Sequence, residues 1–244
     1  MQLSGNTILI TGGATGIGFS LADRFIKKGN TVIICGRREE ALAEAKSRIP
    51  ELHTYVCDVS NEAERVALLF WVTQTFPELN VLINNAGIQR RVNLTEHEPW
   101  EKTMQEIEIN FAAPVHLCML FIAHLEKQAN PAIINVSSGL AFTPLSSVPI
   151  YCATKAAMHS FTLSLRHQLR ATPIEVIEVQ PPAVNTDLGG PGLHTFGVPV
   201  SELTEAVMQG LAEGKQEISH SFSKESSRAS RDELDTIFKR MNPQ

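Results

Sequence analysis

Short apolar runs alternate with helix-length amphipathic segments along almost the whole sequence. The runs are rich in β-branched residues and nearly continuous in hydrophobicity, which is typical of strands buried on both faces of a parallel sheet. Strands are predicted at residues 7–11, 31–35, 53–57, 81–84, 132–137, 175–180 and 217–221. Helical patterns lie at about 16–28, 38–48, 61–76, 99–127, 151–171 and 201–212. This βαβ order predicts an α/β fold, a doubly wound parallel sheet of about seven strands with helices on both faces.

The composition predicts one folded, soluble domain over residues 1–244. Hydrophobic residues make up 43% of the chain and charged residues 19%, so a packed core is expected rather than disorder. The net charge of −5 argues against nucleic acid or an anionic membrane as the main partner. The sequence has no uninterrupted apolar run of about 18 residues and no basic, apolar leader at its start, so it predicts a cytoplasmic protein without a membrane span.

Four cysteines occur, and none forms a CxxC pair. Free thiols in a reducing compartment are therefore expected. Cys152 adjoins a tyrosine of interest and could be read as a nucleophile, but a small packing residue is the favoured interpretation.

The first predicted strand leads into a glycine-rich turn, TGGATGIG at residues 11–18, which opens a helix. Gly12 would permit a tight turn, while Gly16 and Gly18 would let backbone approach a pyrophosphate and let the helix approach the strand. Helix N-terminal amides would then face the phosphates. The alternative is a plain tight connection, because the spacing is not Gly-x-Gly-x-x-Gly.

The end of the second strand bears on the cofactor. The sequence there is Cys-Gly-Arg37-Arg38, with no carboxylate before Glu39. An acidic residue would bind the 2′-hydroxyl of NAD, whereas arginine accommodates the 2′-phosphate of NADP. NADP(H) is therefore favoured over NAD(H), although the arginines could simply begin a surface helix, and the neutral Thr15 supplies no second cation.

Two further turns follow predicted strands. Asp58 comes after the third strand, where it could contact an adenine, and Asn85-Ala86-Gly87 follows the fourth. Small residues there leave room for a cofactor, and asparagine amides can hold neighbouring backbone. Each turn read alone is a common sequence.

Tyr151 and Lys155 are four residues apart, with Ser138 upstream. Four residues make about one helical turn, a rise of roughly 6 Å, so the phenol and the ammonium project from one face. A nearby cation is expected to lower the pKa of the tyrosine from about 10. The Ser138 hydroxyl could hold a substrate oxygen beside the phenol. Together with the glycine turn, this set indicates hydride transfer between a nicotinamide and a carbonyl or alcohol carbon.

TGGATGIG, NNAG, Ser138, YCATK and PPAVNT resemble, in order and spacing, the short-chain dehydrogenase/reductase superfamily over almost the whole chain. The resemblance implies a Rossmann-type fold with one bound NAD(P)(H) and no metal. It implies Tyr151 as general acid/base, Ser138 as the group that orients the substrate oxygen, and Lys155 as the group that lowers the tyrosine pKa and binds the nicotinamide ribose. It further implies that Asn110 holds a water leading to that lysine and that Thr186 contacts the carboxamide. The expected cofactor-binding set is Gly12, Thr15, Gly16, Ile17, Gly18, Arg37, Arg38, Asp58, Val59, Asn85, Ala86, Gly87, Tyr151, Lys155, Pro181, Val184 and Thr186.

Two departures from the family pattern are visible. Pro181-Pro182 stands where the family usually has Pro-Gly, which alters the backbone on the nicotinamide side. The usual C-terminal Asp-Gly-Gly ending is absent, so a homodimer through helices 99–127 and 151–171 is as plausible as a homotetramer. The C-terminal part resembles a bacterial oxidoreductase subgroup labelled after the D-alanyl-lipoteichoic-acid operon.

The substrate end of the site is less defined. Residues 181–200 are rich in glycine and proline and could form a mobile lid or a plain surface loop. Leu140, Leu145 and Leu188, with Ser138 and Tyr151, are the expected substrate contacts, and Phe142, Val184 and Phe196 are further candidates. Arg90-Arg91 could attract an acidic substrate, although a solvated loop pair is favoured.

The remaining motifs bear on alternatives. The histidine pairs 116/124 and 159/167 are about two helical turns apart, so no metal site is expected. Ser230 and Glu233 form a capping box before a helix at about 230–241, expected to dock on its own domain or on a partner subunit. The leading hypothesis is an NADPH-dependent carbonyl reductase or alcohol dehydrogenase. The alternatives are a sugar-nucleotide epimerase or dehydratase, and a non-catalytic NADP-binding redox sensor.

Overall fold

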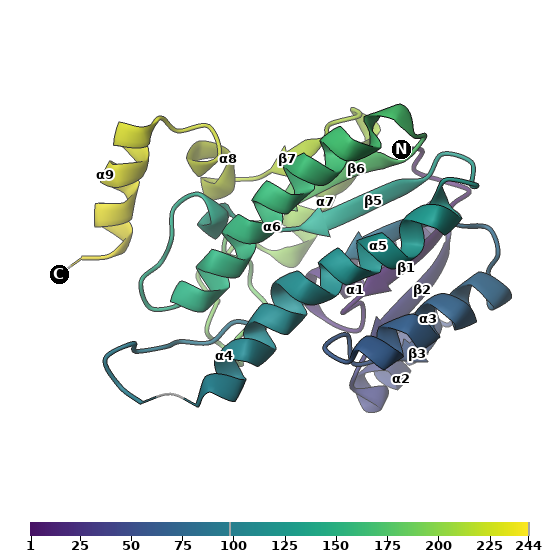
Figure 1. Cartoon of the computed structure of the whole chain (residues 1–244), viewed down its shortest axis with the longest axis horizontal. Helices are drawn as coiled ribbons and strands as arrows, with labels where there is room; N and C mark the ends of the chain where they lie inside the picture. Colours follow the sequence, from purple (N-terminus) through teal and green to yellow (C-terminus); the bar gives the residue numbers. More distant parts are fainter. Residues whose placement is uncertain (98, 244) are drawn as a thin grey trace.

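A seven-stranded parallel sheet forms the centre of the molecule, in the order β3-β2-β1-β4-β5-β6-β7 (Figure 1). The computed structural model describes residues 1–97 and 99–243. The strands are β1 (Thr7–Thr11), β2 (Thr31–Gly36), β3 (His53–Val56), β4 (Leu79–Asn84), β5 (Ala132–Val136), β6 (Glu175–Gln180) and β7 (Glu217–Ser219). β1 and β4 are neighbours in the middle of the sheet. The strands run outward from β1 to β3 on one side and from β4 to β7 on the other, so the strand order reverses between β1 and β4. The predicted α/β class and doubly wound sheet are confirmed.

Helices cover both faces of the sheet. They are α1 (Gly16–Lys27), α2 (Glu39–Arg48), α3 (Glu62–Thr75), α4 (Trp100–Ile107), α5 (Ala113–Leu125), α6 (Pro149–Gln168), α7 (Val200–Ala212), α8 (Phe222–Ser226) and α9 (Arg231–Met241). Short 3₁₀ turns occur at η2 (Gly139–Ala141) and η3 (Leu169–Ala171). Because strand side chains alternate between faces, Ile8 and Ile10 pack with α1, α2 and α7, whereas Leu9 packs with α3, α5 and α6.

The predicted helix 99–127 is interrupted by a π-turn, η1 (Glu108–Ala112), between α4 and α5. Each residue in such a turn bonds five residues away instead of four, so the turn is wider by one residue. The interruption is the main correction to the predicted helices, and it places Asn110 in the widened turn.

Several boundaries also differ from those predicted. The sixth helix begins at Pro149 rather than 151, since proline suits the first helical position, and its last three predicted residues form η3. The last strand ends at Ser219, and the serine-rich segment after it contains the short helix α8.

One helical stretch, Trp100–Leu125, is long and apolar enough by length and composition to cross a membrane, with a mean hydropathy of 1.4 over 18 residues. Charged residues such as Lys102 and Glu106 interrupt the stretch, so the sequence shows no continuous apolar run there. Its residues Leu117, Cys118, Phe121 and Leu125 are buried in the core beneath the sheet. The buried share of the apolar window is 39%, so one face of the stretch packs on the sheet and the other is exposed.

The C-terminal helix α9 begins with the predicted capping box, in which the Ser230 side chain and the Glu233 side chain each bond the other's backbone N–H. Ile237 is buried. The Asn242 amide accepts a hydrogen bond from the Ser146 N–H at 2.6 Å and donates one to the Pro144 carbonyl at 3.1 Å. The helix therefore docks on its own domain, against the loop that precedes α6.

Candidate active site

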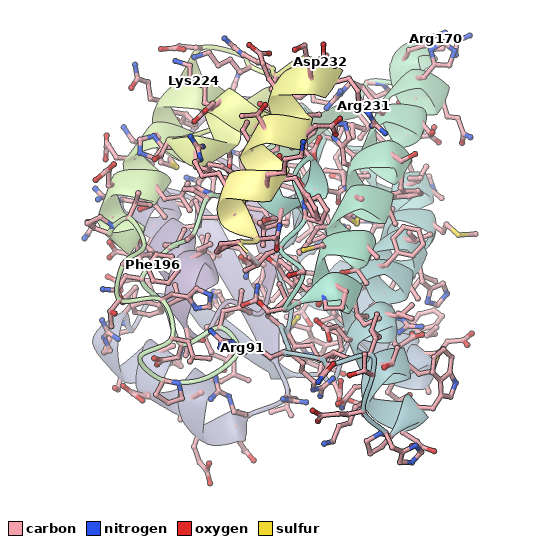
Figure 2. The ribbon with its side chains drawn as sticks, turned by 90° about the vertical axis from the view of Figure 1, so that its left-hand side faces the viewer. Arg91, Arg170, Phe196, Lys224, Arg231 and Asp232 are labelled. Atoms are coloured by element: carbon pink, nitrogen blue, oxygen red, sulfur yellow. The ribbon has the colours of Figure 1, made fainter. Side chains whose placement is uncertain are left out.

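A cleft of about 1660 Å³ lies at the carboxyl ends of the strands. Ligands bind at this end of open parallel sheets, next to the point where the strand order reverses. The cleft is lined by the glycine turn, by the segments that follow β2, β4, β5 and β6, by the loop before α7, and by Arg240 and Met241 of α9. Figure 2 views the molecule from the side that carries α9, with Arg91 and Phe196 labelled; both residues line the cleft.

The glycine turn is compact because three chain segments meet there. Gly12 has φ +63°, and a Cβ on it would lie 2.9 Å from the Cα of Ala86. A Cβ on Gly18 would lie 2.5 Å from the carbonyl oxygen of Gly12. Gly13, which the sequence analysis passed over, would place a Cβ 2.5 Å from Ile34 Cγ2 on β2. α1 can therefore approach the neighbouring strands this closely only because these positions carry no side chain.

The N-terminus of α1 opens on this cleft through Thr15, Gly16 and Ile17. Thr15 precedes the helix with no side-chain cap, and the described first turn carries no acidic residue. The amides there are left for another acceptor, and the helix dipole favours an anion. This end of α1 fits a pyrophosphate.

The end of β2 brings Arg37 and Arg38 to the cleft, as the sequence analysis expected. Arg48 from the end of α2 also lines it, with its guanidinium 4.4 Å from the centre of the Phe19 ring. Arg48 was not predicted, because only the packing of α2 on β2 and β3 brings it to the cleft.

Asp58 is turned toward its own loop. Its carboxylate accepts hydrogen bonds from the Ser60 N–H at 2.9 Å and the Ser60 hydroxyl at 2.7 Å. Its neighbours Cys57 and Val59 line the cleft. The structure therefore places the Asp58 backbone beside the site and uses the carboxylate in the turn.

The segment after β4 is tied to the glycine turn. The Asn85 amide donates hydrogen bonds to the carbonyl oxygens of Thr11 at 2.9 Å and Gly12 at 3.1 Å. The Ala86 N–H donates to the Thr11 hydroxyl at 3.0 Å. Gly87 continues along the cleft wall. This segment holds the turn in shape, which is the role expected for the asparagine amide.

Ser138, Tyr151 and Lys155 come together at the inner wall of the cleft. Ser138 follows β5 and accepts a hydrogen bond from the Leu140 N–H at 3.1 Å. Tyr151 and Lys155 lie in the first turns of α6, and the Lys155 Nζ is 5.6 Å from the centre of the Tyr151 ring. All three side chains are buried. A phenol, a hydroxyl and an ammonium thus share one water-poor corner.

The pKa of Tyr151 differs from the value expected from the sequence. Burial raises the pKa of Tyr151 well above its usual value; the Ser138 hydrogen bond opposes this, and the charges of Cys152 and Glu106 add to it. The expected lowering of the Tyr151 pKa by Lys155 is therefore wrong in net direction. Burial also lowers the pKa of Lys155, to about 8, against the opposing charge of Glu178.

Asn110 anchors the loop after β4 from inside the π-turn. Its Oδ1 accepts from the Ile88 N–H at 2.8 Å, and its Nδ2 donates to the Ile88 carbonyl at 2.8 Å. Nδ2 also lies 3.2 Å from the Thr154 hydroxyl on α6. The side chain joins three elements of the site and is itself 1% exposed.

The predicted substrate residues gather around the tyrosine. Leu140, Leu145 and Leu188 pack against the buried group formed by Val148, Tyr151 and Cys152. Burial raises the pKa of the Cys152 thiol, and its sulfur bonds the backbone of Leu145, as a packing residue would.

The two aromatic candidates behave differently from the leucines. Phe142 packs edge-on against His159, with ring centroids 4.7 Å apart. Phe196 lines the cleft but is 78% exposed.

The segment after β6, which the sequence predicts to lie beside the nicotinamide, lines the cleft. The Pro181 carbonyl accepts a hydrogen bond from the Gly139 N–H at 2.9 Å. Val184 pairs with Val198 in an isolated parallel bridge, which pins the base of the 181–200 loop. Thr186 approaches the glycine turn, 3.4 Å from the position of a Cβ on Gly16.

Two further features of the cleft were missed at the sequence level. Glu106 is fully buried, with an oxygen that has no partner among the described residues, and its charge acts on Tyr151. Its position four residues before Asn110 on a helix could have indicated it. Arg240 reaches the cleft only because α9 docks far from its neighbours in sequence, and no local pattern signals that contact. Within residues 1–97 and 99–243, no three His, Cys, Asp or Glu side chains gather as a metal site would require.

The comparisons agree with this architecture. Residues 6–193 match the short chain dehydrogenase family. The uncharacterized oxidoreductase DltE of Bacillus subtilis (strain 168) is 49% identical over 250 residues, which cover 100% of this chain and 99% of DltE. The predicted resemblance to that subgroup is confirmed.

Two solved structures are similar throughout. A short chain dehydrogenase from Burkholderia cenocepacia J2315 in complex with NADP has a TM-score of 0.85 and 26% identity, covering 98% of this chain and 99% of that one. A 3-ketoacyl-(acyl-carrier-protein) reductase from Brucella melitensis complexed with NADH has a TM-score of 0.82 and 25% identity, covering 91% and 100%. With its sheet order, its glycine turn and its Ser138–Tyr151–Lys155 corner, the chain belongs to the short chain dehydrogenase family of oxidoreductases.

Proposed function

We propose that the protein is an NADPH-dependent carbonyl reductase or alcohol dehydrogenase. It transfers a hydride between nicotinamide C4 and the carbon of a carbonyl or secondary alcohol. The observation that carries this proposal is that Ser138, Tyr151 and Lys155 line the same cleft as the uncapped N-terminus of α1. One end of the cleft suits a dinucleotide, and the other holds a proton donor.

The roles of the three residues follow from their chemistry. A bound nicotinamide cofactor supplies the hydride. Tyr151 is the general acid in reduction, and its raised pKa keeps the phenol protonated until a substrate oxygen gains charge. The Ser138 hydroxyl donates a hydrogen bond to that oxygen, and the Lys155 ammonium stabilises the phenolate that remains. In oxidation the same groups act in reverse.

The preference for NADPH rests on Arg37 and Arg38. Both line the cleft after β2, where guanidinium groups can bind a 2′-phosphate through charge-assisted hydrogen bonds. The Burkholderia cenocepacia relative with NADP supports this choice, whereas the Brucella melitensis structure with NADH keeps the alternative open.

The substrate end favours an apolar carbonyl compound. Leu140, Leu145 and Leu188 surround the tyrosine and offer apolar surface beside the reacting group. We place the protein in the cytoplasm as a homodimer or homotetramer, formed through α4–α5 and α6. Trp100 and Met119, exposed by 66% and 68%, would be covered in such an assembly.

The test is absorbance at the reduced-nicotinamide band with NADPH and with NADH, against a panel of ketones, aldehydes, diketones and 3-oxoacyl thioesters. We expect oxidation of NADPH, with Tyr151→Phe reducing turnover by about 10²–10⁴-fold while cofactor binding persists. Turnover with NADH instead would refute the 2′-phosphate argument and keep the mechanism. Tight NADPH binding with no turnover across the panel would favour a redox sensor.

A further inference from the structure

A carboxylate lies deep in the sheet behind the candidate active site. Glu178 is in β6, fully buried, between Ile177 and Val179, which are both buried too. A buried carboxylate is costly unless it is paired, because water no longer solvates its charge. The function derived above does not use Glu178, so its presence in an apolar strand calls for another reason.

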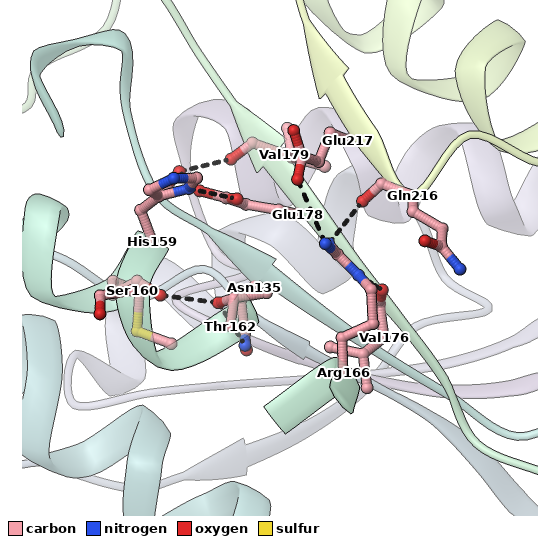
Figure 3. A network of polar contacts seen from close by, with 12 residues as sticks. Asn135, His159, Ser160, Thr162, Arg166, Val176, Glu178, Val179, Gln216 and Glu217 are labelled. Atoms are coloured by element: carbon pink, nitrogen blue, oxygen red, sulfur yellow. Dashed lines mark hydrogen bonds and ion pairs between the residues drawn. The ribbon is translucent and has the colours of Figure 1, made fainter. Parts of the chain in front are cut away.

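Both oxygens of this carboxylate are bonded. Oε1 accepts a hydrogen bond from the Ser137 hydroxyl. Oε2 lies 2.8 Å from Nδ1 of His159, as Figure 3 shows for the labelled pair. The hydrogen bond to Glu178 raises the pKa of His159, while burial lowers it, so the two side chains form an ion pair when the imidazole is protonated. The His159 side chain is 23% exposed and gives the pair contact with solvent.

The pair is joined to the active site through two consecutive residues. The Lys155 ammonium donates to the Val136 carbonyl at 2.8 Å, and Ser137, the next residue, holds Glu178. Lys155 and His159 are four residues apart on α6, so they project from one face of that helix toward β5 and β6. Ser137 also immediately precedes Ser138. The Glu178 carboxylate is therefore bonded to a residue that lies between Val136, the partner of Lys155, and Ser138.

We propose that Glu178 is a positioning residue: its buried carboxylate is the counter-charge that keeps Lys155 an ammonium, and His159 governs how much of that charge Lys155 feels. This inference rests on the proposed function, because it concerns the protonation state of the proposed catalytic lysine. A protonated His159 neutralises the charge of Glu178, so that charge stabilises the Lys155 ammonium less. A neutral His159 leaves the carboxylate charge available to Lys155.

The surrounding charges are few. Glu178 is the charge that opposes burial at Lys155. At His159, Glu217 of β7 raises the pKa and Arg166 of α6 lowers it. Those two also pair with each other at 3.1 Å, as Figure 3 shows, and their effects on His159 oppose each other.

The test is the pH profile of turnover in single variants of the full chain. Glu178→Gln keeps the shape and removes the charge, so the alkaline limb, where Lys155 loses its proton, should move down by about one pH unit or more. Glu126→Gln is the matched control: it removes the same charge from an exposed position at the C-terminal end of α5, and the limb should stay in place.

A second pair of variants tests the part played by His159. His159→Arg keeps a permanent positive charge beside Glu178, and His159→Gln keeps a neutral hydrogen-bond donor. The alkaline limb of H159R should therefore lie at lower pH than that of H159Q. Because His159 is half-buried, this comparison decides the matter even if E178Q does not fold.

The outcomes separate this inference from the proposed function. If Tyr151→Phe abolishes turnover but E178Q leaves the limb in place, or H159R and H159Q coincide, the inference on Glu178 is overturned and the function stands. If Tyr151→Phe retains turnover, the proposed mechanism itself fails.

Discussion

The ammonium of Lys155 donates a hydrogen bond to the Val136 carbonyl oxygen at 2.8 Å, inside the protein rather than in water. The lysine is 4% exposed, and burial lowers its pKa to about 8. Under the proposed mechanism, a lysine with a pKa so close to neutrality makes turnover sensitive to moderately alkaline conditions.

Turnover should therefore fall as pH rises through about 8, because Lys155 loses the charge that stabilises the Tyr151 phenolate. Initial rates of NADPH oxidation between pH 6 and 10, in buffers of constant ionic strength, would measure this limb. Activity that stays level up to pH 10 would contradict the position of the lysine pKa. Cofactor affinity measured at each pH controls for loss of binding.

Lys155→Met should abolish turnover and stabilise the fold. The pKa of Lys155 is lower in the folded state than in the unfolded chain, so its charge opposes folding at neutral pH, and the penalty disappears as pH rises from about 8 toward the ordinary lysine value. At pH 7 the free energy of unfolding should rise on the order of 1–3 kcal/mol. Urea unfolding at pH 7 and pH 10 would test this, since the gain over wild type should shrink at the higher pH.

Arg37→Ala should separate the two cofactors. Loss of a charge-assisted hydrogen bond costs about 1.5–3 kcal/mol, so the Kd for NADPH should rise by about tenfold or more. The Kd for NADH should change little. Fluorescence titration with both cofactors gives the ratio, and Arg170→Ala, an exposed arginine labelled at the top of Figure 2, is the control. Equal losses for both cofactors would refute a 2′-phosphate contact.

Asn242→Ala should weaken substrate binding without affecting the cofactor. The Asn242 amide bonds the backbone of both Pro144 and Ser146, on either side of Leu145, which we propose to contact the substrate. Without these bonds the loop is less ordered, and KM should rise by several-fold while kcat and NADPH affinity remain similar. Lys239→Ala, exposed on the same helix, serves as the comparison. An unchanged KM would mean that α9 does not position the loop.

The sheet and most helices could be predicted because their signals are local. Alternating faces place Ile8 and Ile10 against one helical layer and Leu9 against the other, and that pattern is visible in the sequence. The glycine turn could also be predicted, because its glycines lie close together in the sequence after an apolar run. In the structure, side chains at Gly12 and Gly18 would collide with neighbouring backbone.

The features that escaped prediction depend on contacts between distant segments. The pKa of Tyr151 shifts in the direction opposite to that expected, because burial raises it more than the Ser138 hydrogen bond lowers it, and burial is a tertiary property. Asn242 meets Ser146 across 96 residues, which no local pattern reveals. Glu178 was different: a carboxylate inside an apolar strand was visible in the sequence and could have been recognised.

The wide turn at Glu108–Ala112 also constrains how the chain can change length. In this turn the hydrogen-bonded residue is the fifth rather than the fourth, so the turn accommodates one extra residue while α4 and α5 keep nearly the same phase. Removing one residue from Glu108–Ala112 would therefore leave Leu117 and Phe121 in the core, but Asn110 would lose the widened turn from which it holds Ile88. Removing one residue from α5 itself would instead rotate the apolar face of that helix by about 100° away from the sheet. We therefore expect a deletion in the wide turn to be tolerated by the fold and to loosen the loop after β4, and a deletion in α5 to unfold the protein.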